Sequence, residues 1–416
     1  MQKFAISFTL SVLSCAFFLF FIEISLNVFV YVKNIDKKKQ ECLPFYRSTL
    51  TQRGLESGIV YQNRYFSFRL GPNSKYMTEN YKGVELPEEV YGKYQNEDLI
   101  LESNEWGFIK TKGKELDPFK KYPEKLKVVF FGGSSMMGCG APYHESIPSY
   151  FHEKLLSHGI DNLVINAGVI NYSSKEEFLY YSMEVVNLKP DIVIFFDGYN
   201  DQYGSVDVKN GYSVSLRPFY DIREVSKSLS NVSLLFLKRL LPKTMIGIEK
   251  AVNLVRESKK GEPFFEEMKK KYDINFESFV RNNIGVSLSH KVACIVALQP
   301  ELFSKELEDL SPYEKTVYND LMERSLGPDM RKAEYRYGYA KKVFKELENE
   351  FRNNKGVVVA DWLEMFSGIK ETTYVDNIHY TAKGNEIIAD NLVSVVLQMD
   401  KSLWKKSQKD KNGNNP

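Results

Sequence analysis

The chain has 416 residues, in which 56 lysines and arginines nearly balance 54 aspartates and glutamates. This length allows one large domain with insertions or two smaller domains, and the balance of charge excludes the strong positive field that draws a protein onto nucleic acid. The four cysteines are scattered and lack metal-ligand spacing, so we expect no disulfide framework, no metal site and no cofactor; they are Cys15, Cys42, Cys139 and Cys294.

The first predicted element is a hydrophobic segment, residues 4–32, which is long enough to cross a bilayer as a helix. A cleaved signal peptide is shorter and ends in small residues, whereas this segment ends in bulky ones such as Phe29 and Tyr31. Cys15 stands in a sequence like a lipoprotein box, but apolar residues continue well beyond it. We therefore predict a retained transmembrane anchor over residues 1–32.

The charges beside this segment bear on its orientation in the membrane. Lys3 precedes it, while Lys33, Lys37, Lys38 and Lys39 follow it, a bias that would keep the rest of the chain in the cytoplasm. Large domains can translocate regardless of such charges. The flanking residues therefore leave the orientation open.

After the anchor, residues 33–120 are polar and aromatic with little periodicity, and we expect an irregular lead-in there. From residue 126 onward, short apolar runs alternate with amphipathic stretches, which is typical of a parallel sheet covered by helices. A capping box at Ser174–Glu177 opens one such helix, which must stop near Pro190. The predicted strands cover residues 126–131, 163–165, 191–196, 292–298 and 357–360.

We predict that these strands form one α/β domain over residues 121–400, followed by a polar tail, residues 401–416. Two of its connections, residues 202–290 and 300–354, are far longer than the usual link of a few residues. Insertions of this length are usually lids or binding elements. The charged stretch 262–271, within the first insertion, is more typical of a solvated helical face than of a specific binding surface.

The first candidate site residue follows the first predicted strand, in Gly132-Gly133-Ser134-Ser135. The two glycines allow a tight turn that leaves a serine at the carboxyl edge of the sheet, where open α/β sheets place their ligands. No Gly-Lys-Ser or Gly-Lys-Thr ending follows, so a phosphate-binding loop is not indicated. Taken alone, such a turn is common, and other residues must decide whether it is functional.

Those residues stand near the end of the chain, in Asp376-Asn377-Ile378-His379. A serine hydroxyl needs a neighbouring base to become a nucleophile, and an imidazole needs a carboxylate to fix its tautomer and stabilise its charged form. Ser134, His379 and Asp376 could together supply all three groups. The other histidines lack such company and are expected to be ordinary surface or core residues; they are His144, His152, His158 and His290.

The motifs of this chain resemble those of the SGNH/GDSL hydrolase superfamily, in particular its membrane-anchored bacterial members. The four blocks of that family match, in order, Gly132-Gly133-Ser134, Asn166-Ala167-Gly168-Val169, Gly198-Tyr199-Asn200-Asp201 and Asp376 to His379. Residues 104–108 also look like the segment that precedes the first strand in anchored members. One departure is Gly133, which replaces the aspartate of the usual Gly-Asp-Ser; that aspartate is not part of the triad.

The resemblance implies a flavodoxin-like SGNH fold, a three-layer α/β/α parallel sheet with helical insertions behind the transmembrane helix. It also implies that Ser134 is the nucleophile, with His379 as base and Asp376 as its partner. The oxyanion hole would consist of the backbone N–H groups of Ser134 and Gly168 and the side-chain amide of Asn200. Ser135 remains a rival nucleophile.

The function that these motifs favour is hydrolysis of O-acyl esters, O-acetyl esters foremost, on a glycan or lipid at a membrane face. An alternative is an O-acetyltransferase that modifies cell-envelope polysaccharide with the same residues. A third reading is a catalytically silent glycan-binding module, which would be expected to have lost Ser134, His379 or Asn200. The resemblance to envelope-modifying members favours an extracytoplasmic domain, and the absence of clustered tryptophans gives a preference for hydrolysis over transfer.

Overall fold

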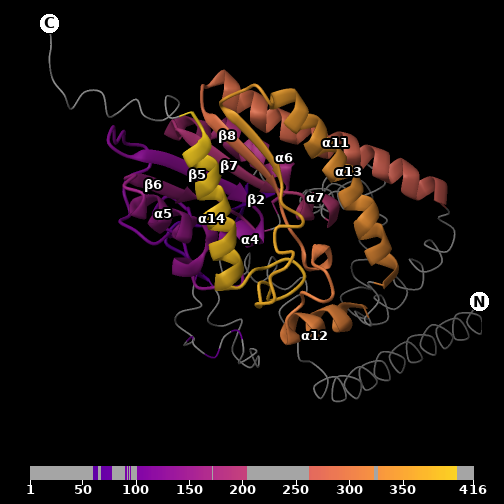
Figure 1. The fold of residues 1–416 in the computed structure, drawn as a ribbon. Coiled ribbons are helices and arrows are strands. Elements are labelled where there is room, and N and C mark those ends of the chain that lie inside the picture. Colours follow the sequence, from indigo (N-terminus) through magenta and orange to yellow (C-terminus); the bar gives the residue numbers. More distant parts are fainter. Residues whose placement is uncertain are drawn as a thin grey trace, which may run out of the picture. The chain divides into compact units, whose positions relative to one another are not determined.

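The computed structural model describes residues 60–63, 67–76, 90, 92, 94, 101–170, 172–203, 262–322 and 327–400 (Figure 1). The predicted anchor, the polar tail and much of the insertion 202–290 lie outside these residues. Within them, no helix combines the length and the hydrophobicity that crossing a bilayer requires. The site and the sheet belong to one compact unit, Phe45–Ser215 with Lys270–Pro416.

The centre of this unit is a parallel sheet of five strands in the spatial order β6-β5-β7-β8-β9. Numbered along the chain, this is the order 2-1-3-4-5 of the flavodoxin type. The strands are β5 (Leu126–Gly132), β6 (Asn162–Asn166), β7 (Ile192–Asp197), β8 (Ala293–Leu298) and β9 (Val357–Asp361). The predicted parallel sheet is confirmed, and each predicted strand lies within a residue or so of the observed bounds.

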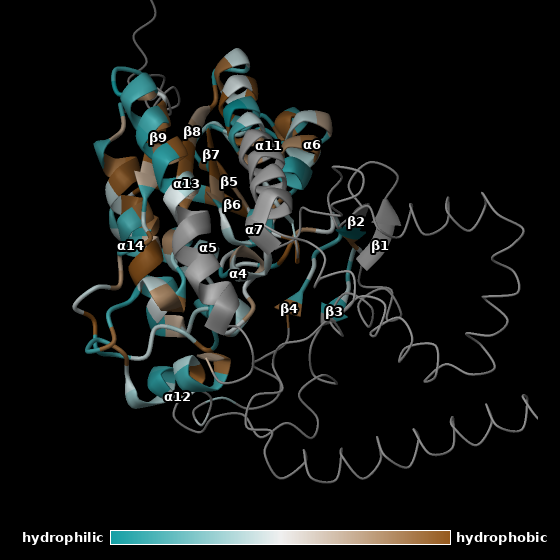
Figure 2. Ribbon diagram, turned by 90° about the vertical axis from the view of Figure 1, so that its right-hand side faces the viewer, coloured by the Kyte–Doolittle hydropathy of each residue, from teal (hydrophilic) through white to brown (hydrophobic). Residues whose placement is uncertain are grey.

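Helices cover both faces of the sheet, which explains why its strands are apolar on both sides. Helices α5 (Ile147–Ser157) and α14 (Ala382–Gln398) pack side by side on one face. On the other face lie α6 (Ser174–Met183), α11 (Glu262–Ser289) and α13 (Gly327–Phe351). Figure 2 shows the hydrophobic strands between helices that carry hydrophilic residues.

Short elements at the ends of the strands carry the site. Helix α4 (Ser134–Met137) follows β5, and α7 (Tyr199–Tyr203) follows β7. Helix α12 (Pro312–Leu321) lies in the connection between β8 and β9. Because all five strands are parallel, α4 and α7 stand at the same, carboxyl edge of the sheet.

The lead-in that was expected to be irregular contains paired strands. Strands β1 (Val60–Asn63) and β2 (Ser67–Leu70) form one antiparallel pair, and β3 (Lys75–Tyr76) and β4 (Leu101–Glu102) form another. Ile109 then bridges to Asn166, at the end of β6, and is buried. Strands of two to four residues are too short for an alternating pattern to appear in the sequence.

The predicted capping box of α6 is wrong by one residue. The N-cap is Ser173, and Glu176 reaches back to it, instead of Ser174 and Glu177. The shift has a physical reason, because Ser174 and Glu177 are both buried and their side chains are directed towards Asp201 and Asp197. A 3-10 turn, Val185–Leu188, follows the helix, and the helical segment ends before Pro190 as expected.

Candidate active site

The turn after β5 presents Ser134 as the first residue of α4, about nine-tenths buried. A Cβ atom at position 133 would lie 2.2 Å from Asn200 Nδ2, so a side chain there would displace the Asn200 amide. An aspartate at this position, as in Gly-Asp-Ser, would meet the same amide. The departure from Gly-Asp-Ser is therefore matched to the position of Asn200.

The structure brings Ser134, His379 and Asp376 together. Ser134 Oγ lies 2.6 Å from His379 Nε2, and His379 Nδ1 lies 3.0 Å from each carboxylate oxygen of Asp376. All three side chains are buried. An ionised carboxylate only accepts, so Nδ1 carries the proton and Nε2 is free to accept the proton of the serine hydroxyl.

Burial shapes the protonation of this pair. Removal from water lowers the pKa of His379 to about 3, so the imidazole is neutral at neutral pH, as a base must be. Burial also raises the pKa of Asp376 to about 7, while the backbone N–H groups of His379 and Ile378 oppose the rise. These two N–H groups favour the ionised carboxylate, which is the form that accepts the proton of His379 Nδ1.

The loop that holds Asp376 and His379 is fixed from several directions. Asp376 Oδ1 accepts the backbone N–H groups of Ile378 and His379, each at 2.8 Å. The two sides of the loop are paired, since the Val375 N–H donates to the His379 carbonyl at 2.9 Å. Base and carboxylate are therefore held on one rigid turn.

A buried ion pair supports the start of this loop. The carboxylate of Glu314, on α12, accepts the backbone N–H groups of Thr373 and Tyr374 at 2.8 and 3.1 Å. Lys305 Nζ lies 2.8 Å from the other oxygen, and both side chains are wholly buried. Sequence reasoning missed this pair, because nothing in the local pattern indicates that a lysine and a glutamate of the second insertion meet below the loop.

The three predicted oxyanion donors differ in their present partners. Ser134 is the first residue of α4, so its N–H has no acceptor within the helix. Asn200 Nδ2 donates to the Tyr172 carbonyl at 2.8 Å, which uses one of its two hydrogens. The Gly168 N–H donates to Asn166 Oδ1 at 2.9 Å, so an oxyanion could receive it only as a shared donor.

Gly168 is packed tightly against the turn that carries Ser134. A Cβ atom at this position would lie 2.5 Å from the backbone nitrogen of Met137, the last residue of α4. The Asn166 amide completes the contact by donating to the Met136 carbonyl at 3.0 Å. The second block thus supports the back of the nucleophile turn.

Three buried carboxyl groups lie close together at the third block, namely Asp201, which belongs to that block, and Glu177 and Asp197, whose place there sequence reasoning missed. Asp201 Oδ1 accepts the N–H and hydroxyl of Ser174 at 3.1 and 2.5 Å, which ties α7 to the start of α6. Glu177 and Asp197 face each other, and neither carboxyl has a donor among the described residues other than a proton shared between them.

Burial raises the pKa of each of these acids, and repulsion from the neighbouring acids adds to the effect for Asp197 and Glu177. The pKa of Asp197 rises to about 8 and that of Asp201 to about 6, while the pKa of Glu177 rises well above its usual range. The Ser174 hydrogen bonds hold Asp201 below the other two. A proton is therefore part of this cluster at neutral pH.

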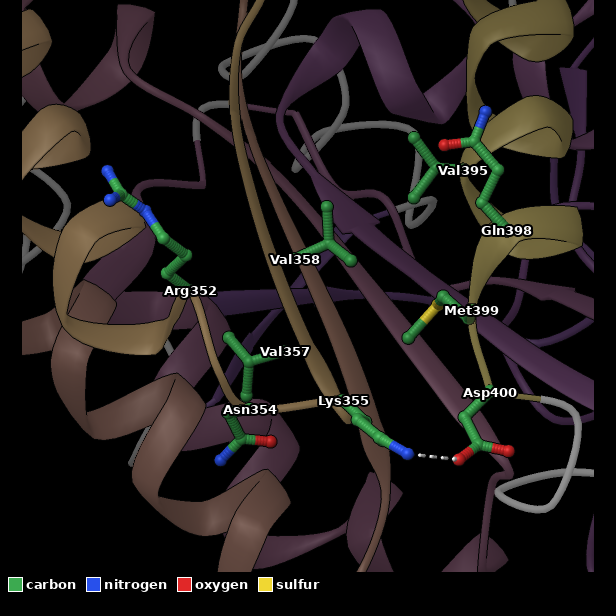
Figure 3. Close-up of a pocket in the computed structure, with 9 residues that line it drawn as sticks. All are labelled: Arg352, Asn354, Lys355, Val357, Val358, Val395, Gln398, Met399 and Asp400. Carbon is green, nitrogen blue, oxygen red and sulfur yellow. Dashed lines mark ion pairs between the residues drawn. The ribbon is translucent and has the colours of Figure 1, made fainter.

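A cavity of about 540 Å³ lies elsewhere in the unit (Figure 3). Its lining includes Arg352 and Val357 beside Met399, and Lys355 forms an ion pair with Asp400 at 3.5 Å. Val357 begins β9, so the cavity is at the amino edge of the sheet, opposite to the edge that carries Ser134. Among the described residues, no group of three or more His, Cys, Asp or Glu side chains could hold a metal ion.

Comparisons with known proteins give similarity of structure only. No protein-family model and no curated protein matches the sequence. Among solved structures, the acetyl xylan esterase AlAXEase is 15% identical, with 65% of this chain and 99% of that one covered, at a TM-score of 0.37. TesA is 11% identical (67% and 99% covered, TM-score 0.37), and a mutant of Axe2, an acetylxylan esterase from Geobacillus stearothermophilus, is 14% identical (66% and 94%, 0.37). At these identities and TM-scores, the similarities say nothing of this chain's activity.

Proposed function

We propose that this protein is a serine-dependent ester hydrolase that acts on O-acyl esters, O-acetyl esters foremost, of a glycan or lipid at a membrane face. The observation that carries the proposal is the unbroken hydrogen-bonded chain from Ser134 Oγ through the His379 imidazole to Asp376. Such a chain turns a weakly nucleophilic hydroxyl into an attacking group. A silent binding module would have no need to keep it.

The reaction follows from the positions of these atoms. His379 Nε2 takes the Ser134 proton as Oγ attacks the ester carbonyl, and Asp376 stabilises the imidazolium that forms. His379 then returns the proton to the departing alcohol, which leaves an acyl-serine. A water molecule, deprotonated by the same imidazole, attacks the acyl-serine, and His379 then returns the proton to Ser134 Oγ as the acid is released.

The oxyanion of the tetrahedral intermediate would be stabilised by the Ser134 N–H and by the second hydrogen of the Asn200 amide. Preorganised donors of this kind are usually among the largest contributions to the rate. The Gly168 N–H would add a weaker, shared contact, because Asn166 already accepts it. Of the three predicted donors, Asn200 and Ser134 should therefore stabilise the oxyanion more than Gly168 does.

The membrane part of the proposal rests on the sequence of residues 4–32. An anchor there would restrict the enzyme to substrates close to the bilayer, and we place the catalytic domain outside the cytoplasm. Protease added to spheroplasts should then remove the domain, and complete protection would contradict this orientation. Membranes washed with carbonate should retain the full chain; release into the wash would contradict the anchor.

The activity is tested by replacing the nucleophile. The full chain should cleave p-nitrophenyl acetate and react with a serine-directed phosphonate, and Ser134→Ala should lose both reactions while its circular dichroism stays unchanged. Phosphonate labelling that persists in Ser134→Ala would contradict the assigned nucleophile. Mass spectrometry of reactions with added oligosaccharides separates hydrolysis from transfer, since acetylated oligosaccharide formed at the expense of acetate would show an acyltransferase.

A further inference from the structure

The serine next to the nucleophile is bound into a network of its own. Ser135 is the second residue of α4 and is 3% exposed. Its Oγ lies 3.1 Å from the Ile378 carbonyl and 2.7 Å from Gln299 Nε2. Gln299 directly follows β8 and is also buried. Three segments that are far apart in the sequence therefore meet at one hydroxyl.

The direction of these hydrogen bonds is fixed by the number of protons. A serine hydroxyl has one proton to donate, and the Gln299 Nε2 group can only donate. The Ser135 proton therefore goes to the Ile378 carbonyl. The opposite amide orientation would leave two acceptors, Gln299 Oε1 and the Ile378 carbonyl, competing for that single proton, at the cost of an unsatisfied buried group.

The Ile378 carbonyl belongs to the peptide unit that leads into His379. The N–H of that same unit is the His379 N–H, which donates to Asp376 Oδ1 at 2.8 Å. Ser135 and Asp376 thus hold the two ends of one peptide plane. Since this plane places the Cα atom of His379, it also determines where the imidazole starts.

The same short helix that carries the nucleophile therefore also fixes the backbone of the base. Ser134 Oγ meets the ring at Nε2, at 2.6 Å, and Ser135 Oγ meets the main chain just before it. Two contacts between the same pair of segments remove the freedom of one to pivot about the other. A misplacement of about 1 Å in such a pair can cost 10²-fold in rate.

We propose that Ser135 and Gln299 are positioning residues, which hold His379 in hydrogen-bonding reach of Ser134, and that Ser135 is not a nucleophile. The effect on rate rests on the proposed esterase function, whereas the effect on geometry does not. Ser135 acts through the Ile378–His379 peptide. Gln299 acts through Ser135, because its amide donates to the hydroxyl and leaves the Ser135 proton for the Ile378 carbonyl. Because Ser135 contacts the peptide directly and Gln299 contacts only Ser135, replacing Ser135 should have the larger effect.

The kinetic test compares Ser135→Ala with a matched control in the full chain. Ser287→Ala removes another wholly buried serine whose hydroxyl donates to a backbone carbonyl, that of Asn283 at 2.8 Å, in α11. Ser135→Ala should lower kcat for p-nitrophenyl acetate by about 10²-fold with KM unchanged, Gln299→Met should lower it less, and Ser287→Ala should leave kcat unchanged. Equal kcat values for the two alanine variants would overturn the proposal.

The positioning role can also be tested without the kinetics of Ser135→Ala. In a crystal structure of Ser135→Ala, the distance from His379 Nε2 to Ser134 Oγ should exceed hydrogen-bonding length; an unchanged 2.6 Å would refute the positioning role even if the wild type hydrolysed no ester. If Ser135→Ala fails to fold, Gln299→Met takes its place, and kcat and geometry equal to wild type would refute the proposal. Phosphonate found on Ser135 by peptide mass spectrometry would also refute it.

Discussion

Placing a methyl group at position 133 should act on the oxyanion site through a single contact. Gly133 has φ −77° and ψ −150°, a conformation open to any residue, so Gly133→Ala adds no backbone strain. The new Cβ would lie 2.2 Å from Asn200 Nδ2, closer than non-bonded atoms approach. The Asn200 amide must then move away and lose its 2.8 Å hydrogen bond to the Tyr172 carbonyl.

The size of the effect follows from what the amide does. Loss of one oxyanion donor costs about 10² to 10³ in turnover, and Asn200→Ala should show the same loss. If the methyl group acts only by displacing this amide, Gly133→Ala should cost almost nothing more once Asn200 has been replaced. The double variant should therefore be strongly non-additive, as expected for residues in contact.

The assay is kcat for p-nitrophenyl acetate in wild type, both single variants and the double variant. Gly285→Ala is the matched control, because a Cβ atom there meets nothing within 4 Å. It should keep full activity and gain stability of up to about 1 kcal/mol from its helical position. Additive losses, or a Gly133→Ala variant with wild-type turnover, would refute the assignment of Asn200 to the oxyanion site.

Two more predictions concern the buried acids. Asp376→Asn should lower kcat by about 10⁴-fold at unchanged stability, because an amide favours the wrong imidazole tautomer; a loss confined to KM would contradict the role of Asp376. Burial raises the pKa of Asp197 from 3.8 to about 8, so the folded protein keeps a proton that the unfolded chain has released. The melting temperature should therefore fall as the pH rises from 3.8 to about 8, and Asp197→Asn should flatten this dependence. Identical slopes of melting temperature against pH in wild type and variant would contradict the prediction.

The sheet was predictable because its strands are buried on both faces. Stretches such as residues 192–196 are continuously apolar, and the helices between the strands begin and end with local signals such as Pro190. The capping box of α6 was misplaced by one residue because Ser173 and Ser174 both precede a glutamate by three positions. Only the partners Asp197 and Asp201 decide between the two registers, and they come from a later strand and helix.

The proximity of Ser134, His379 and Asp376 was predictable because these residues stand in short, recognisable motifs. The contacts that support them were not predictable, because they join distant segments: Ser135 and Ile378 are 243 positions apart, and Glu314 and Thr373 are 59 positions apart. The partner of the Gly168 N–H was also not predicted. Rotation of one peptide unit decides whether that N–H faces a substrate or Asn166, and a sequence motif does not specify this rotation.

The separation of nucleophile and base along the chain affects the time at which activity can arise. Ser134 and His379 are 245 positions apart, and the loop that carries His379 precedes α14, the helix that packs against α5. On the proposed mechanism, a chain emerging from the ribosome presents Ser134 long before His379, its proposed base, has been synthesised. On the proposed mechanism, a truncated product that lacks the loop of His379 is therefore inert, and Ser134 becomes reactive only in a molecule whose α14 has packed against α5.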